Sequence, residues 1–217
     1  MEEISIETKQ RALNDFDEAC LFVISHHNNS LERLKNRQNL VENFEDYFEE
    51  SVYCIIASGF RAEIAAGLVD DIVACGGDTE KMSRIFNNKN KLNAIKKTFE
   101  MRKNWPDLRE KLLNCKNIDD VAALKLPFIG KIISHHLARN IGLFPQSSKP
   151  DLHMMRYVDA INWAPKNEIA VTNLCQFIAK NRDFNEGCVD FIFWIWLSHE
   201  KGKNSQKKCC IKNLILR

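Results

Sequence analysis

The chain contains little glycine and proline, with 8 Gly and 5 Pro among 217 residues. All-β proteins need these residues at their many tight turns, so the composition argues against a β-sandwich or a β-barrel. A long apolar segment is also missing, because the longest run, residues 191–197, is far shorter than the roughly 20 residues that cross a bilayer. We read this run as a buried helix. The first twenty residues are charged and amphipathic, unlike a secretory signal. We therefore expect an intracellular protein with no membrane partner.

An excess of charge of one sign is absent, because the formal net charge is only +2. A nucleic-acid site would therefore depend on local clusters of lysine and arginine. The basic segment 201–217 is one such cluster, and we expect it to form a solvated tail. The eight cysteines are scattered and include no Cys-x-x-Cys pair, so neither a zinc ribbon nor a redox motif is indicated. Most of them are expected to be reduced, buried side chains.

Apolar residues recur at helical spacing almost throughout, which predicts an all-α fold. The expected helices cover residues 6–25, a segment from 31, and then 41–58, 62–75, 79–86, 91–104, 106–114, 118–124, 131–141, 152–161, 168–180 and 187–199. Local signals mark some of their ends: Gly76 and Gly77 stop one helix, Asp78 caps the next, and Pro106 suits a first turn. The polar segment 87–91 is predicted to be a surface loop.

Residues 118–141 have the pattern of a hairpin between two helices. A short apolar helix runs into Pro127, followed by a turn, by Gly130 and by a new helix. In a helix-hairpin-helix, the backbone N–H groups at the start of the second helix hold a DNA phosphate, helped by the helix dipole. Gly130 permits a close approach, and Lys131 adds a cation. The residues expected to contact DNA are Pro127, Phe128, Ile129, Gly130, Lys131, Ser134 and Arg139. The alternative is an ordinary corner between helices without a ligand.

The span 124–160 resembles the helix-hairpin-helix DNA glycosylase superfamily, especially its archaeal-type 8-oxoguanine and endonuclease-III-like branches. Members carry a Leu-Pro-Gly-x-Gly hairpin, a helix, and an Asp about twenty residues past the second Gly. Here Asp151 follows Gly130 by 21 residues. The intervening helix, Ser-His-His-Leu-Ala-Arg-Asn-Ile-Gly over 134–142, is similar to the Ser-His-x-x-Arg-Asn-x-Gly stretch of the archaeal-type branch.

This resemblance implies one domain over residues 1–200, made of two helical lobes flanking a cleft. It also implies a monomer that binds double-stranded DNA through phosphates and accepts a flipped-out nucleotide. No cofactor is implied, although a hairpin of this type can hold a monovalent cation.

The sequence departs from the family pattern at the hairpin. Phe128 stands where the first Gly is usual, and Ile132 stands where the bifunctional members carry their Schiff-base Lys. Lys131 is one residue early, which rotates its side chain by about 100° on a helix. Lyase chemistry is therefore not expected, and Lys131 is only a second candidate for a catalytic group. The four-cysteine iron–sulfur motif at the C-terminus of some members is also missing.

Asp151 is the candidate catalytic carboxylate. Cleavage of an N-glycosidic bond builds positive charge on the deoxyribose, which a fixed carboxylate beside the anomeric carbon stabilises. Asp151 follows Pro150 and precedes a helix with apolar periodicity, so it is predicted to be an N-cap that is held rigidly. The alternative is a structural cap and nothing more.

Other side chains have supporting roles in this interpretation. His136 and His153 are expected to brace the helix of the carboxylate or to line the cleft. A metal site is not expected, because the adjacent His135 and His136 point about 100° apart on a helix. Arg139 and Arg156 either contact phosphate or pair with acids. The wedge that replaces a flipped base has six aromatic candidates: Phe60, Trp105, Phe144, Trp163, Phe191 and Trp194.

Three functions remain open at this point. The first is a DNA glycosylase without a Schiff-base lysine. The second is a glycosylase-fold enzyme of phage-type thymine hypermodification, because Lys149-Pro150-Asp151 loosely resembles proteins assigned to that chemistry. The third is a non-catalytic DNA-binding module.

Overall fold

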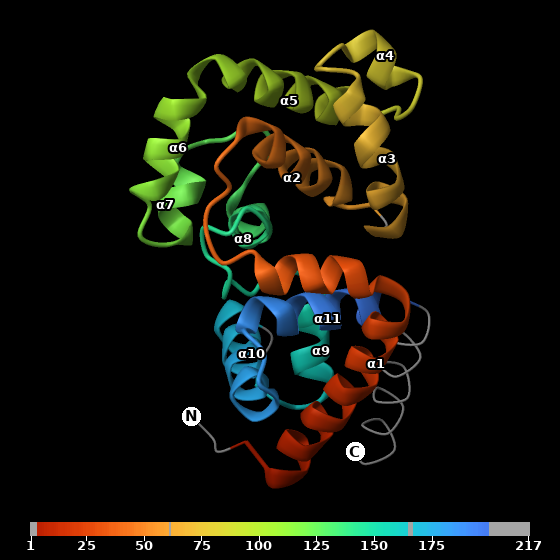
Figure 1. Ribbon diagram of the computed structural model, residues 1–217. Helices are drawn as coiled ribbons and strands as arrows, with labels where there is room; N and C mark the ends of the chain where they lie inside the picture. Colours follow the sequence, from red (N-terminus) through yellow and green to blue (C-terminus); the bar gives the residue numbers. More distant parts are fainter. Residues whose placement is uncertain (1–3, 61, 165–166, 200–217) are drawn as a thin grey trace. The chain divides into compact units, whose positions relative to one another are not determined.

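The computed structural model describes residues 4–60, 62–164 and 167–199 (Figure 1). Its elements are α1 Ile6–Asn36, α2 Phe44–Ala57, α3 Ala62–Ala74, α4 Thr79–Ser83, α5 Lys89–Glu100, the 3-10 helix η1 Met101–Asn104, α6 Trp105–Leu113, α7 Ile118–Ala123, α8 Lys131–Asn140, α9 Leu152–Ala160, α10 Glu168–Arg182 and α11 Glu186–Ser198. This described part contains no strand, so the all-α prediction is confirmed. None of its helices is both long and apolar enough to cross a bilayer. The predicted tail 201–217 lies outside the described residues.

Several predicted helix ends are confirmed by local contacts. The Asp78 side chain accepts hydrogen bonds from the backbone N–H groups of Glu80 and Lys81 at the start of α4. Pro106 lies in the first turn of α6. Gly76 and Gly77 follow α3 with φ angles of 58° and 79°, a left-handed conformation that favours glycine. These ends were predictable because each depends on a few consecutive residues.

Two predicted boundaries differ slightly from those observed. The first helix breaks close to its predicted end, because the backbone at His27 is non-helical (φ −138°, ψ 24°), but the helix resumes directly behind the kink and runs to Asn36 instead of restarting at residue 31. Residues 87–90 are exposed as predicted, but the loop is shorter than predicted because α5 begins at Lys89. The Asn88 side chain caps α5, and Lys91 in its first turn is only 5% exposed. Two of the rings near Lys91, Phe60 and Phe128, are distant in the sequence.

The chain divides into two compact units, and in unit 1 the helix α11 is central. Unit 1 comprises the described residues of 1–36 and 146–217, and unit 2 comprises residues 37–145. α11 packs against α1, α9 and α10, as the blue ribbon in Figure 1 illustrates. Every residue of 187–197 is buried. An all-round apolar helix needs such an enclosed position, which confirms the interpretation of 191–197 as a buried helix.

In unit 2 the central helix is α2, which packs against α3, α5 and α8. Its aromatic side chains build the core: Phe44 and Phe48 stack with 5.7 Å between their ring centroids, and Trp105 lies edge-on to Phe44 at 5.9 Å. The Trp105 indole N–H donates to the Glu42 carbonyl at 3.0 Å. This core supports α8, which follows the predicted hairpin.

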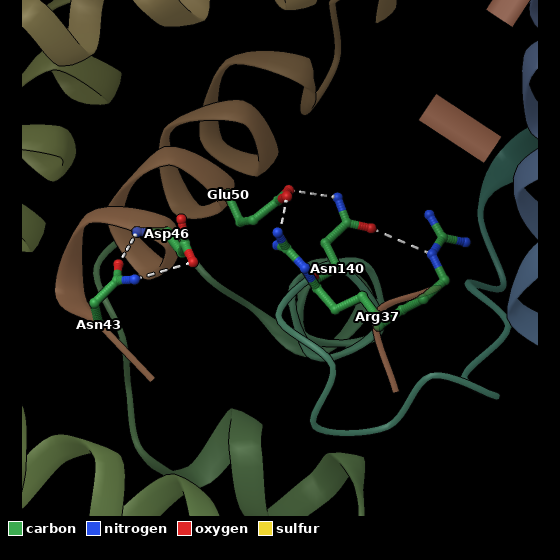
Figure 2. A network of polar contacts seen from close by, with 6 residues as sticks. Arg37, Asn43, Asp46, Glu50 and Asn140 are labelled. Carbon is green, nitrogen blue, oxygen red and sulfur yellow. Dashed lines mark hydrogen bonds and ion pairs between the residues drawn. The ribbon is translucent and has the colours of Figure 1, made fainter. Parts of the chain in front are cut away.

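A buried ionic network ties α8 to α2 (Figure 2). Glu50, on α2, is 3% exposed. One of its carboxylate oxygens accepts from Arg37 Nη1 at 2.9 Å, and the other accepts from Asn140 Nδ2 at 3.0 Å. The same Arg37 nitrogen donates to the Asn140 carbonyl at 3.0 Å. Both oxygens of this buried acid therefore have a partner.

Gly142 allows the chain to pass close to this network. Its φ is +76°, and a Cβ atom there would lie 2.1 Å from the Asn39 carbonyl oxygen. Nearby, the Val41 N–H donates to the Ile141 carbonyl at 2.9 Å. Any larger residue at position 142 would force this backbone contact apart.

We expect replacement of Glu50 with Ala to destabilise the protein by about 3–5 kcal/mol, because Arg37 and Asn140 lose their buried partner. The free energy of unfolding, measured by urea denaturation, tests this. A control is Glu80→Ala, which removes an acid from an ion pair with Arg84 whose side chains are 80% and 73% exposed. That change should alter stability by less than about 1 kcal/mol. Equal effects of the two variants would contradict a structural role for the network.

Candidate functional site

The turn between α7 and α8 contains both buried and exposed residues. The two helices pack against each other, and Leu126 and Ile129 anchor the turn with exposures of 4% and 5%. The Ile129 N–H donates to the Leu126 carbonyl at 3.0 Å. Phe128, Gly130 and Lys131 are exposed. The predicted helix–turn–helix geometry of 118–141 is therefore present, with its buried residues alternating with exposed ones.

Phe128 has a left-handed backbone, with φ +66°. This is the position where the glycosylase pattern usually has its first Gly, a residue that adopts such angles freely. A side chain other than glycine is strained there by about 1–2 kcal/mol. Phenylalanine therefore stands at 128 in a conformation that favours glycine.

The start of α8 is open. Gly130 is the N-cap residue and supplies no side-chain cap to the first N–H groups. By contrast, an Asn side chain caps each of α2, α5, α7, α10 and α11. A Cβ at Gly130 would meet nothing within 4 Å. Its φ of −84° does not require glycine, so the residue contributes free space in front of amide groups that can bind an anion.

The side chains behind the turn differ in exposure. Lys131 Nζ lies 3.8 Å from the Asp119 carboxylate, and both side chains are largely exposed. Ser134 is fully buried and its hydroxyl donates to the Gly130 carbonyl at 3.1 Å. Arg139 is 1% exposed, and its Nε donates to the Asn140 side-chain oxygen at 3.3 Å.

These buried positions do not fit the direct DNA contacts predicted for Ser134 and Arg139. For Arg139 the alternatives were a contact with phosphate or pairing within the protein. Its burial favours polar partners within the protein. His136 is also buried and lies edge-on to Tyr53, with 5.4 Å between the ring centroids. Its position fits a bracing role. The sequence pattern could not separate these residues from exposed ones, because all lie on one helix whose buried face depends on distant segments.

Asp151 is the N-cap of α9 in unit 1, as predicted. One carboxylate oxygen accepts from the N–H groups of His153 and Met154 at 2.9 and 3.0 Å. The other lies 3.3 Å from Lys149 Nζ. Lys149 is 8% exposed, and its Nζ lies 4.3 Å from the centroid of the Trp194 ring. The carboxylate is thus held in one orientation by two amides and an ammonium group.

Lys149 did not appear among the candidate site residues from the sequence. The signal that could have identified it is the Lys-Pro-Asp order, which brings the lysine beside the acid across one proline. On α9 itself, His153 is half-buried and Arg156 is exposed. Their predicted roles stay predictions, and Arg156 has the exposure that a phosphate contact requires.

The six aromatic residues that could act as the wedge differ in how deeply they are buried. Trp105, Trp163, Phe191 and Trp194 are 4–9% exposed and belong to the cores of their units. Phe144 is half-buried. Phe60, after the end of α2, is 41% exposed. Within the described residues, no three His, Cys, Asp or Glu side chains are grouped so that they could hold a metal ion.

The strain at Phe128 can be measured with two variants that both lack the ring. We expect Phe128→Gly to be more stable than Phe128→Ala by about 1 kcal/mol, because only alanine is strained at positive φ. Urea denaturation gives the difference. At the exposed helical position Lys97 the order should reverse, with Lys97→Ala more stable than Lys97→Gly. The same order at both positions would show that residue 128 is not left-handed in solution.

With this geometry described, we compared the chain with known proteins. No family model, curated protein or solved structure matches it.

Proposed function

We propose that this protein is a DNA-binding enzyme of the helix-hairpin-helix glycosylase type, which removes a damaged or modified base. The observation that carries the proposal is the α7–α8 hairpin, whose exposed turn leaves the first amide groups of α8 open to an anion. The second support is Asp151, a carboxylate held at the start of a helix 21 residues after Gly130. Each of these features alone also occurs where it has only a structural role.

In the proposed complex, the hairpin binds a phosphate of the DNA backbone. The open amide groups of α8 donate to it, the positive end of the helix dipole attracts it, and the exposed Lys131 adds a charge. These contacts read no base, so they place the protein on DNA of any sequence. Recognition of the base must come from other side chains.

In the proposed reaction, the target nucleotide leaves the duplex, because a stacked base cannot reach a protein carboxylate. As the N-glycosidic bond breaks, positive charge develops on the deoxyribose and the Asp151 carboxylate stabilises it. The amides of His153 and Met154 fix the direction of the carboxylate beforehand, and Lys149 holds its second oxygen. The proposal requires the hairpin of unit 2 and Asp151 of unit 1 to act on the same DNA molecule.

A specific observation favours a second candidate, a DNA-binding module without catalysis. Both oxygens of Asp151 already have partners within the protein, as they would in a purely structural cap. Transfer of a group to thymine is the remaining alternative. The products distinguish the three: a free base, an adduct on an intact nucleotide, or binding without chemistry.

We expect Asp151→Asn to lower the rate of base release by about 100- to 10,000-fold while DNA binding persists. Asparagine caps a helix about as well as aspartate, so the variant removes the charge and keeps the cap. The measurements are release of free base from oligonucleotides carrying a panel of modified bases, and binding by fluorescence anisotropy.

The matched control is Asp78→Asn, which makes the same change at the N-cap of α4 and should leave base release unaltered. Release at the normal rate by the Asp151 variant would remove the catalytic role of this acid. Another outcome is that the unaltered protein binds DNA tightly and releases no free base from any oligonucleotide. That result would exclude the glycosylase and favour the binding module or the transfer enzyme.

Lys131→Gln should weaken DNA binding and flatten its salt dependence, because one phosphate contact is lost. The slope of log K against log salt concentration should decrease in magnitude by about 0.9. Lys96→Gln, an exposed lysine on α5, removes the same charge away from the hairpin and serves as control. Identical slopes for both variants would indicate general charge attraction instead of a hairpin contact.

A further inference from the structure

Phe128 combines backbone strain with an exposed ring. Its φ is +66° and its exposed fraction is 40%. A residue with a large side chain seldom adopts this backbone conformation. Strain that persists at an exposed loop position points to a function for the residue. The feature to explain is therefore why an aromatic ring stands on this turn at all.

A second exposed ring belongs to the same surface of unit 2. Phe60 follows Gly59 after the end of α2 and is 41% exposed. Its ring lies edge-on to that of Phe86, with 5.6 Å between centroids, and Phe86 is only 8% exposed. Phe60 thus rests on a buried ring and keeps much of its own surface open.

The side chain of Lys91 connects the two exposed rings. Its Nζ lies 5.8 Å from the centroid of Phe128, 5.9 Å from that of Phe60 and 5.8 Å from that of Phe86. Both exposed rings therefore lie around one nitrogen, although 68 residues separate them in the sequence. The separation of their centroids is therefore at most about the sum of the two distances.

Lys91 is fixed in this position. Its Nζ donates to the carbonyls of Ile56 at 2.8 Å and Ser58 at 2.6 Å, at the C-terminal end of α2. The residue is 5% exposed, and burial lowers the pKa of its ammonium group. Rings around an ammonium otherwise form a site for cationic ligands. Here the protein's own cation occupies that place, so a cationic ligand is excluded.

We propose that Phe60 and Phe128 form an aromatic platform on which an unpaired nucleobase stacks while the start of α8 holds an adjacent phosphate. The ligand class is DNA with locally unpaired bases. This inference rests on the proposed DNA-binding function, because the phosphate contact is the one described for the hairpin. Every base has a π face, so stacking on such rings is tolerant of sequence and strengthens binding by about 5- to 100-fold per base.

Several observations favour a nucleotide over another apolar partner. The platform and the open amides of α8 share one turn, since Phe128 and Gly130 are two residues apart. Lys131 adds a positive charge beside them. A nucleotide combines a flat apolar face with an anion, and this surface offers a partner to each part.

The test compares binding of two labelled duplexes of equal length, one fully paired and one with a central unpaired stretch. The unaltered protein should bind the unpaired duplex about 5- to 100-fold more tightly. The double variant Phe60→Leu/Phe128→Leu should lose this preference, so that its affinities for the two duplexes become equal. Phe60→Tyr/Phe128→Tyr should retain the preference, because tyrosine also stacks. Leu113→Ala, which changes an exposed apolar residue on α6, should behave as the unaltered protein.

Each outcome decides something. A preference retained by the leucine variant, or missing from the unaltered protein, overturns the platform and leaves the hairpin contact standing. Failure of the unaltered protein to bind either duplex overturns the platform together with the proposed function. Circular dichroism shows whether the double variant folds. If it does not, each single leucine variant should lose part of the preference, and a full preference in both singles overturns the platform.

Discussion

The buried carboxylate of Glu50 is the contact on which the arrangement of unit 2 depends. It joins Arg37 and Asn140, so it fastens the C-terminal end of α8 to α2. α8 is only ten residues long. A rigid helix that is fixed at one end is also directed at the other, where the open amides and the hairpin turn begin. A buried acid is costly unless its partners are in place, and it therefore selects one packing of α8 among those that apolar contacts alone would permit.

This constraint gives a physical reason for the residue pattern over 134–142, which led to the glycosylase resemblance. Ser134 bonds to the Gly130 carbonyl, Asn140 bonds to Glu50, and Gly142 lets the Asn39 backbone approach. These residues build the support of the hairpin, and none of them needs to touch DNA for the pattern to be useful. The packing of α8 therefore accounts for this pattern without reference to a ligand. In the proposal, the exposed turn makes the contacts with a phosphate. This turn is also where the sequence differs from the family pattern.

The sequence alone predicted what depends on neighbouring residues. The helices follow from apolar periodicity, and the caps at Asp78 and Asp151 follow from an acid placed just before such a pattern. Burial of polar side chains was not predictable, because the partners are far away in the chain. Glu50 and Asn140 are 90 residues apart, and Lys91 stands in a polar segment yet donates to carbonyls more than thirty residues earlier. The break at His27 lies two residues past the predicted end of the first helix, but the next helix begins directly behind it instead of at residue 31.

The hairpin and Asp151 differ in how their interactions are satisfied in the free protein. At the hairpin, the first amides of α8 lack a side-chain cap, and Phe128 is strained while its ring stays partly in water. In the proposed complex the amides gain a phosphate and the ring gains a base, so DNA would stabilise this part of the fold in proportion to its affinity. Asp151 already has two amides and an ammonium group as partners. In the proposed reaction it would gain little from a neutral ligand, and a new attraction would arise only when positive charge develops on the sugar. An interaction that strengthens in the transition state raises the rate instead of the affinity. Binding and chemistry would then depend on different residues in different units, which is why variants of Lys131 and of Asp151 can separate them.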